Sequence, residues 1–186
     1  MASQPRRCTS APRRLLASAL CSLIAAAAPA WAEAVSENDL KAAFVFNFAV
    51  FTEWPQDALS SGAPLSLCAS TASPLFAALS QLNDKLVNGH RIRVRASGAT
   101  ARSCHVLVLE RADRERWTQL RRDLGAPANV LTVADEAGTV AEGAVISMSV
   151  EGKRIGFDID MAAARAARLT LSSKLLRLAR SVQWSP

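Results

Sequence analysis

The hydrophobic positions that follow residue 36 repeat first with the period of an α-helix. Over residues 37–53, one helical face carries Leu40, Phe44, Phe48 and Phe51. Ser36 is a suitable N-cap, and Trp54-Pro55 ends the helix because proline disfavours the helical conformation in the residue before it. Asn47 lies beside the apolar face, so we expect its amide to hydrogen-bond the backbone of a neighbouring loop. Trp54 is expected to fill the core or its rim.

The middle of the chain alternates between strand and helix patterns. Short apolar runs predict strands over residues 65–69, 104–110 and 130–134. Residues 90–96 alternate between apolar side chains and arginines, which is typical of a half-exposed edge strand. Helices are predicted from Ser73-Pro74 onward and over residues 114–124, the second between Asp113 as N-cap and Gly125 as C-terminal stop.

The last part of the chain predicts a hairpin and then a long helix. Residues 145–150 and 154–159 are the two strands of the hairpin. Residues 161–183 are expected to form one helix with an inward face of Leu171, Leu175, Leu178 and Val182. Its outer face is basic and consists of Arg165, Arg168, Lys174, Arg177 and Arg180. Together these elements predict a single α/β domain with a mixed, mostly parallel sheet, helices on both faces, and a C-terminal hairpin and long helix.

The first 32 residues have the three parts of a secretory signal. A basic segment ends at Arg14, an apolar run covers residues 15–28, and Ala30-Trp31-Ala32 offers a cleavage site before Glu33. We therefore expect a cleaved signal peptide over residues 1–32 and an exported domain over residues 33–186; a retained N-terminal anchor is the alternative. The signal contains four of the 22 basic residues and no acid, so 18 basic residues remain against 16 acidic ones. That balance gives no argument for a nucleic-acid partner.

Two cysteines, Cys68 and Cys104, remain once the signal peptide is removed. In an exported domain they most simply form one disulfide bond. Two free thiols are one alternative, and a metal site with His90 and His105 is another. The metal site lacks the usual C-x-x-C and H-x-x-x-H spacings, and an oxidising compartment disfavours free thiolates.

The sequence contains no G-x-S-x-G, H-E-x-x-H, Walker A or G-x-G-x-x-G motif. Asp158 and Asp160 lie on the same side of a strand and suggest a carboxylate pair or a cation site, although Asp160 at this place is more often a helix N-cap. These residues indicate a non-enzymatic domain with no catalytic residue, no metal and no cofactor. The polar residues Asp135–Gly138 follow a buried strand at its carboxyl end, which makes them a candidate ligand cleft.

Several motifs occur along the mature chain. It opens with Lys41–Phe48, then Phe51 and Glu53-Trp54-Pro55, and continues with Cys68, Cys104 and Asn129–Asp135. It closes with Ile155–Asp160 and Leu169–Ala179. Taken together, these motifs resemble the YfiR family of periplasmic regulators over essentially the whole mature chain. The resemblance implies structural roles for the opening-motif residues Lys41, Phe44, Asn47, Phe48, Phe51, Trp54 and Pro55.

The resemblance also implies the role of a non-catalytic repressor. YfiR-like proteins bind the periplasmic portion of an inner-membrane diguanylate cyclase of the YfiN type, which keeps cyclic di-GMP synthesis and biofilm formation low. A lipoprotein of the YfiB type sequesters the repressor, and a disulfide that matches Cys68–Cys104 supports its fold. A homodimer is compatible with this role. The candidate partner-binding residues are Asp158, Leu169, Leu171, Ser172 and Lys174.

The alternative function is that of a periplasmic small-ligand-binding protein that serves another membrane sensor, such as a histidine kinase. The chain departs from the family pattern at two places. It lacks the second cysteine pair that some members carry around the late strands, so no redox switch through that pair is expected. Its strand motif reads Asp158 and Asp160 where the family has Glu and Asn, a change that bears on the partner contact.

Overall fold

The computed structural model describes residues 36–98, 101–136, 143–152 and 154–184, which belong to one compact α/β unit. The expected signal peptide, and Ala137 and Gly138 of the expected cleft, lie outside these ranges. No helix within them is both long and apolar enough to cross a membrane.

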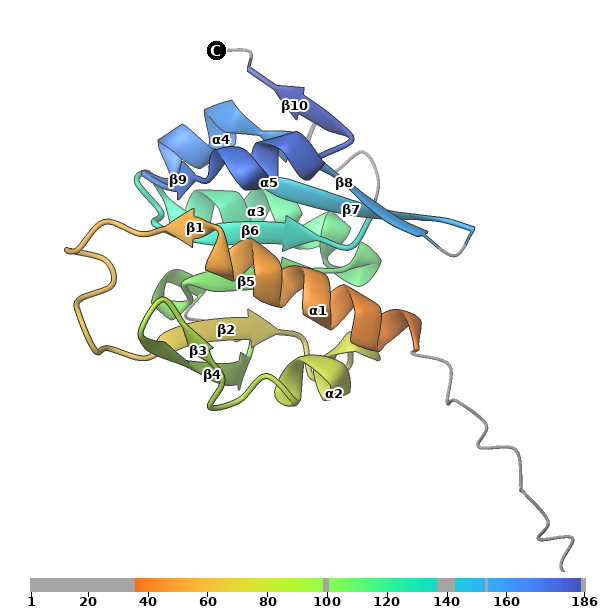
Figure 1. Ribbon diagram of the computed structural model, residues 1–186, viewed down its shortest axis with the longest axis horizontal. Helices are drawn as coiled ribbons and strands as arrows, with labels where there is room; N and C mark the ends of the chain where they lie inside the picture. The colour runs from red at the N-terminus through yellow and green to blue at the C-terminus, as the bar shows by residue number, and fades with distance from the viewer. Residues whose placement is uncertain (1–35, 99–100, 137–142, 153, 185–186) are drawn as a thin grey trace, which may run out of the picture. The chain divides into compact units, whose positions relative to one another are not determined.

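An eight-stranded sheet forms the centre of the domain, in the order β10-β8-β7-β6-β5-β2-β4-β3 (Figure 1). The strands are β2 (Leu65–Ala69), β3 (Leu86–Val87), β4 (His90–Ala96), β5 (Val106–Leu109), β6 (Leu131–Ala134), β7 (Ile146–Glu151), β8 (Arg154–Asp160) and β10 (Ser181–Gln183). Neighbouring strands are parallel except in the pairs β7–β8 and β3–β4. A separate antiparallel ribbon joins β1 (Thr52–Glu53) to β9 (Thr170–Leu171).

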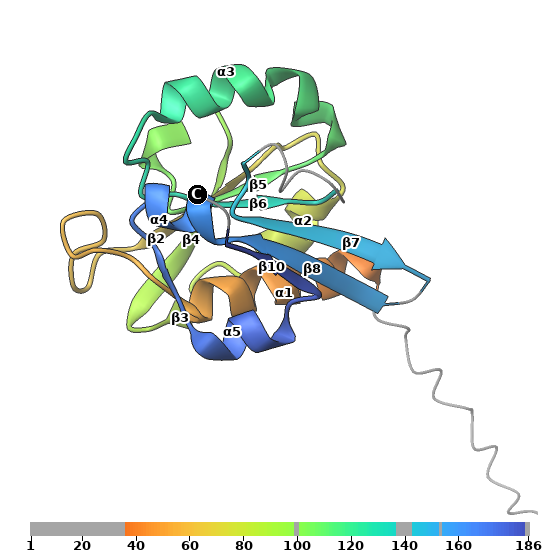
Figure 2. The same ribbon diagram turned by 90° about the horizontal axis from the view of Figure 1, so that it is seen from above.

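Helices cover both faces of this sheet. They are α1 (Glu37–Val50), α2 (Leu75–Ser80), α3 (Arg114–Leu124), α4 (Met161–Ala166) and α5 (Ser173–Leu178), with the short 3₁₀ turns η1 (Ala101–Ser103) and η2 (Arg111–Asp113). Figure 2 shows α3 on one side of the sheet and α1 with α5 on the other. Each side has its own buried apolar cluster, the larger under α1 and α2 and the smaller under α3. The predicted fold class is therefore confirmed.

The first helix begins as predicted, but the predicted inner face is only partly correct. The Ser36 side chain accepts a hydrogen bond from the Asp39 N–H, and the helix ends at Val50, before Trp54-Pro55. Its buried residues are Lys41, Ala42, Val45, Phe48 and Ala49, while Leu40, Phe44 and Phe51 are only partly buried. Phe44 and Phe51 still pack against the core from its edge. The most buried face differs from the predicted one because this helix is apolar around most of its circumference, so helical spacing alone does not select a face.

The predicted strands and helices of the middle segment are all present. Gly125 ends α3 with a positive φ of 65°, a conformation that favours glycine. Asp113 precedes α3 but does not cap it with its side chain. Instead, the Asp113 carboxylate accepts a hydrogen bond from the Glu110 N–H and pairs with Arg116.

The predicted long helix over residues 161–183 is wrong. The chain forms α4, then β9, then α5, and returns to the sheet as β10. Arg168 has a positive φ of 57°, which ends the first helix, and Ser172 caps the second by accepting a hydrogen bond from the Lys174 N–H. As a result Leu171 and Leu175 are buried as expected, but Leu178 is 67% exposed.

Candidate functional site

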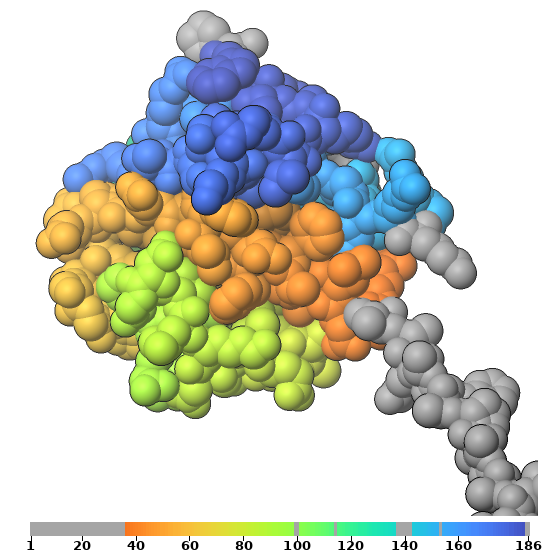
Figure 3. Space-filling model, viewed as in Figure 1, coloured from red at the N-terminus to blue at the C-terminus, as the bar shows by residue number. Residues whose placement is uncertain are grey.

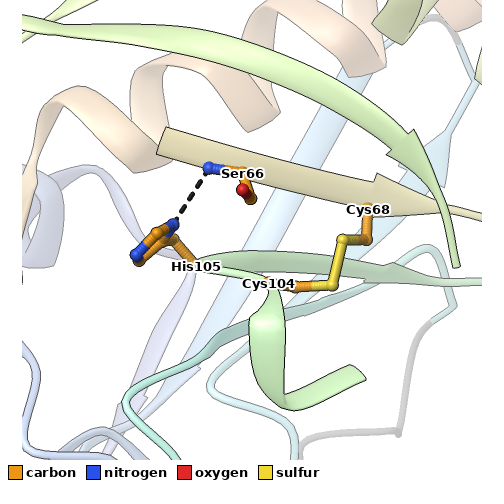
Figure 4. The surroundings of a disulfide bond; sticks show 4 residues. All are labelled: Ser66, Cys68, Cys104 and His105. Atoms are coloured by element: carbon orange, nitrogen blue, oxygen red, sulfur yellow. Dashed lines mark hydrogen bonds between the residues drawn. A yellow bond between two sulfur atoms is a disulfide. The ribbon is translucent and has the colours of Figure 1, made fainter. Parts of the chain in front are cut away.

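A disulfide bond joins Cys68 to Cys104 (Figure 4). Cys68 lies in β2, Cys104 lies two residues before β5, and their Cα atoms are 5.9 Å apart. The bond agrees with the expected pairing, and neither cysteine is a free thiol in this structure. It links two parallel strands at the place where the strand order reverses, because β4 lies on one side of β2 and β5 on the other.

His105 follows the disulfide directly and holds a loop against the sheet. Its Nδ1 accepts a hydrogen bond from the Ser66 N–H at 2.9 Å (Figure 4), and its Nε2 lies 3.2 Å from the Ala58 carbonyl oxygen. The Trp54 ring packs edge-on, at 6.5 Å between centroids. Burial is the main cause that lowers the pKa of His105, and the positive charges of His90 and Arg95 lower it further.

A cavity of about 790 Å³ opens between α3 and the sheet, beside the segment that leads to Cys104. Its apolar wall includes Leu107 and Leu109 of β5 and Leu120 of α3, and its polar rim includes Arg102 and Arg116. This volume is within the range of small-molecule sites. A second hollow, of about 740 Å³, lies between α3 and the alanine-rich α4.

The polar end of β6 forms an ion pair. Lys41 Nζ lies 2.8 Å from Asp135 Oδ2 and 2.7 Å from Glu37 Oε1, and Lys41 is only 8% exposed. Burial alone would lower the pKa of Lys41, but the hydrogen bonds and charges of Asp135 and Glu37 outweigh it, so the pKa is raised. Neither Asp135 nor Glu136 lines either of the cavities described above. The ion pair of Lys41 and Asp135 instead joins the opening motif, Lys41–Phe48, to the motif Asn129–Asp135.

The aromatic residues of the opening motif pack in the core. Phe48 is 1% exposed and contacts Phe157 edge-to-face at 4.9 Å between centroids, with Phe44 at 6.0 Å. Phe51 and Pro55 are partly buried, and the Pro55 carbonyl oxygen accepts the Ala58 and Leu59 N–H groups.

The expected contact of Asn47 with a neighbouring loop is wrong. Its side chain is exposed, and its amide donates to the Ala43 carbonyl oxygen of the same helix. Trp54 lies at the rim of the core, partly buried against His105, as expected.

Asp158 and Asp160 have separate partners and do not act as a pair. Arg180 and the Ser181 hydroxyl both donate hydrogen bonds to the Asp158 carboxylate, and Arg180 also pairs with Glu151. The hydrogen bond from Arg180 is the main cause that holds the pKa of Asp158 below its usual value. Asp160 caps α4 by accepting the Ala163 N–H at 2.9 Å, the more ordinary of the two roles considered for it.

The remaining partner-binding candidates differ in exposure. Leu169 and Leu171 are 5% and 6% exposed, so their side chains lie in the core and are not part of the protein surface. Ser172 is partly buried as the cap of α5, and Lys174 is exposed. No group of three His, Cys, Asp or Glu side chains within the described ranges could hold a metal ion.

The C-terminal residues lie next to α1 on one face of the molecule (Figure 3), and several of their exposed side chains are basic. We define this C-terminal surface by its exposed side chains Arg165, Arg168, Lys174, Arg177, Leu178 and Trp184. Leu178 is 67% and Trp184 56% exposed, and the Arg165 guanidinium lies 5.7 Å from the Trp184 ring centroid. The predicted long helix would have buried Leu178, so sequence reasoning missed this exposed apolar residue. The Ser172-Ser173 pair is a local N-cap signal, and it marks the point where the predicted helix is interrupted and α5 begins.

The described residues therefore form a disulfide-bonded α/β unit with a small-molecule-sized cavity and an exposed, largely basic C-terminal surface. The chain belongs to the YfiR/HmsC-like family, whose model matches residues 38–180. This is a family of periplasmic regulators in diguanylate cyclase signalling rather than of enzymes.

Among solved structures, the chain is similar to a conserved domain protein from Vibrio cholerae O1 biovar El Tor, with 12% sequence identity and a TM-score of 0.48. The match covers 80% of this chain and 60% of that protein. A comparison with curated protein sequences gave no match.

Proposed function

We propose that this protein, exported with residues 1–32 as a cleaved signal peptide, binds the periplasmic part of an inner-membrane diguanylate cyclase of the YfiN type. Binding represses cyclic di-GMP synthesis and biofilm formation without any catalysis by this chain. The observation that supports the proposal is the family match over residues 38–180. A YfiB-like lipoprotein is the expected competitor for the repressor, and a homodimer is compatible with the same role.

The C-terminal surface is the proposed contact with the cyclase. Two large apolar side chains, Leu178 and Trp184, stand exposed there among arginines and lysines. Exposed aromatic and arginine side chains are the residue types most enriched at the energetic centres of interfaces. The surface therefore suits a partner segment that combines acidic and apolar residues.

The repression needs a difference in affinity between two states of the cyclase. A repressor with equal affinity for the active and inactive states does not change their populations. To change the ratio of the two states from 1:99 to 99:1, it must bind one state more tightly by about 5.5 kcal/mol. The cyclase state that the repressor favours must therefore present the matching segment more completely than the other state does.

The proposal is tested by cellular cyclic di-GMP in the native host. Deletion of the gene should raise the level, and the intact gene should restore it. Lys174→Glu/Arg177→Glu, which reverses two exposed charges of the C-terminal surface, should fail to restore it. Arg91→Glu, on β4 towards the opposite edge of the sheet, is the matched control and should restore it. An unchanged level on deletion would refute the cyclase as partner.

The cavity beside α3 favours a second candidate function, the binding of a small ligand for another membrane sensor such as a histidine kinase. Its volume of about 790 Å³ is sufficient for a metabolite-sized molecule. A thermal-shift screen of purified protein without any partner tests this function. Ala101→Leu, which narrows the cavity from η1, should abolish any shift that arises there.

A further inference from the structure

Two hydrogen bonds of opposite direction join His105 to Ser66 of β2. The His105 N–H donates to the Ser66 carbonyl oxygen at 2.8 Å, and the Ser66 N–H donates back to the imidazole Nδ1 at 2.9 Å (Figure 4). The imidazole thus takes the place of a backbone acceptor for a residue that is only 5% exposed. A buried N–H that loses its acceptor destabilises the closed arrangement, because the donor is then without any partner.

The second ring nitrogen fixes the tautomer. Nε2 lies 3.2 Å from the Ala58 carbonyl oxygen, which can only accept, so Nε2 carries the proton. Nδ1 is then the unprotonated nitrogen, as the Ser66 N–H requires. Both nitrogens of the neutral ring are used, one towards the sheet and one towards the loop that contains Ala58.

We infer that His105, Ser66 and Ala58 form a pH-sensitive latch, which holds the loop of residues 54–60 against β2 and β5 only while the His105 ring is neutral. A proton on Nδ1 would point directly at the Ser66 N–H and leave two donors face to face. The ring would have to leave this position, and the bond to Ala58 would be lost with it.

The Ala58 carbonyl oxygen favours a positive charge on the ring, but burial and the neighbouring cations outweigh it, because the pKa of His105 is lowered. The ionisable side chains that act on it, His90 and Arg95, both come from β4 and both disfavour the imidazolium. From the loop side, the neutral Trp54 ring packs against it. Burial adds to these effects and is the largest cause of the lowered pKa of His105.

The direction of the pH effect follows from the lowered pKa. Above about pH 6.5, the ordinary histidine value, the ring is neutral whether the latch is closed or open. As the pH falls below that value, the open form binds a proton first, so the latch weakens by up to roughly tenfold per pH unit until the lowered pKa of the closed form is reached.

His90 provides an internal comparison, because its imidazole contacts a backbone carbonyl in the segment that leads from this loop to β2. Its Nδ1 lies 2.8 Å from the Ala63 carbonyl oxygen and therefore acts as a donor. Protonation of His90 at Nε2 leaves that hydrogen bond in place. The chain contains two histidines, so these two residues account for all histidine titration in the protein.

The loop connects the latch to the C-terminal surface. Arg168 forms two hydrogen bonds with the Asp57 carboxylate, at 2.7 and 3.0 Å, one residue before Ala58. The preceding strand β1 pairs with β9, directly before α5. The regulatory consequence rests on the proposed function: acidification of the periplasm would loosen the partner-binding surface and release the cyclase.

The experiment is an NMR titration of the protein from about pH 7.5 to 5. The imidazole nitrogen shifts should show His105 as the Nε2–H tautomer with a midpoint below 6.5, and the protection factor of the Ser66 amide against hydrogen exchange should fall between pH 6.5 and that midpoint. A His105 midpoint at or above 6.5, or Ser66 protection that is unchanged as the ring protonates, would overturn the latch. These readouts need no partner, so they fail or succeed independently of the cyclase proposal.

Two matched variants separate the histidines. His105→Asn keeps an acceptor close to the Nδ1 position but does not titrate, so Ser66 protection should become independent of pH over this range. His90→Asn should leave the acid-induced loss of protection unchanged. A transition that persists in His105→Asn, or that disappears in His90→Asn, would also overturn the inference. If His105→Asn does not fold, the wild-type titration alone decides.

Discussion

Removal of the Cys68–Cys104 disulfide should cost much of the domain's stability while the folded structure persists. The bond closes a loop of 36 residues. The loop-closure model gives a loss of about 4 kcal/mol at 25 °C for this length, because the unfolded chain gains conformational entropy without the cross-link. The free energy of unfolding of a domain of this kind is about 5–15 kcal/mol in total. The reduced protein should therefore remain folded, but with little of that free energy left.

The assay is urea unfolding of the oxidised and reduced wild-type protein, with Cys68→Ala/Cys104→Ala as a third sample. Reduced wild type is the cleaner comparison, because both sulfur atoms are buried and alanine would also leave empty space. The unfolded state should expose more surface without the cross-link, so the urea m-value should rise. A difference below about 1 kcal/mol between the oxidised and reduced protein, with equal m-values, would refute the argument.

Three further changes have expected outcomes in the same urea assay. Asp160→Ala removes the cap of α4 and should lower the free energy of unfolding by about 1 kcal/mol, whereas Asp160→Asn should restore most of the loss. Lys41→Met should cost roughly 2 kcal/mol, less than a fully buried pair because the Asp135 side chain is 13% exposed, and adding Asp135→Leu should recover part of it. A Lys41→Met protein as stable as wild type would contradict the structural role of this pair. The lowered pKa of Asp158 means that its ion pair contributes above about pH 4 and is lost as the pH falls through the lowered value. Asp158→Asn should therefore lower the free energy of unfolding at neutral pH and make it depend less on pH in acid. An unchanged dependence on pH in acid would contradict the role of the Asp158–Arg180 ion pair.

The strands and the disulfide were predictable because their signals are local or compositional. The alternation of residues 90–96 and the apolar run of residues 65–69 correspond directly to β4 and β2. Two cysteines in an exported chain leave one obvious pairing. The mostly parallel character of the sheet follows from the alternation of strands and helices, whereas the order of the strands was not predicted.

The largest error came from a contact between residues far apart in the sequence, whereas the wrong roles of Asn47 and Asp113 came from local hydrogen bonds. Leucine spacing over residues 169–178 imitates a helix, but Thr170 and Leu171 pair with Glu53 and Thr52, which no local pattern reveals. The buried position of Lys41 depends on Asp135, 94 residues away. His105 gave no signal at all, because its two partners are backbone groups of Ser66 and Ala58.

The interlocking of the two ends of the domain has a consequence for how it is made. The Ser172 N–H donates to the Phe51 carbonyl oxygen at 2.9 Å, and Phe48 packs on Phe157. During synthesis, α1 is made before the other described elements, and its neighbours α2 and β3 follow it closely. Phe157 and Ser172 come 109 and 121 residues after Phe48 and Phe51, their partners in α1 and at its end. Contacts of such long sequence separation slow folding. These two contacts can therefore form only after nearly all of the domain has been synthesised.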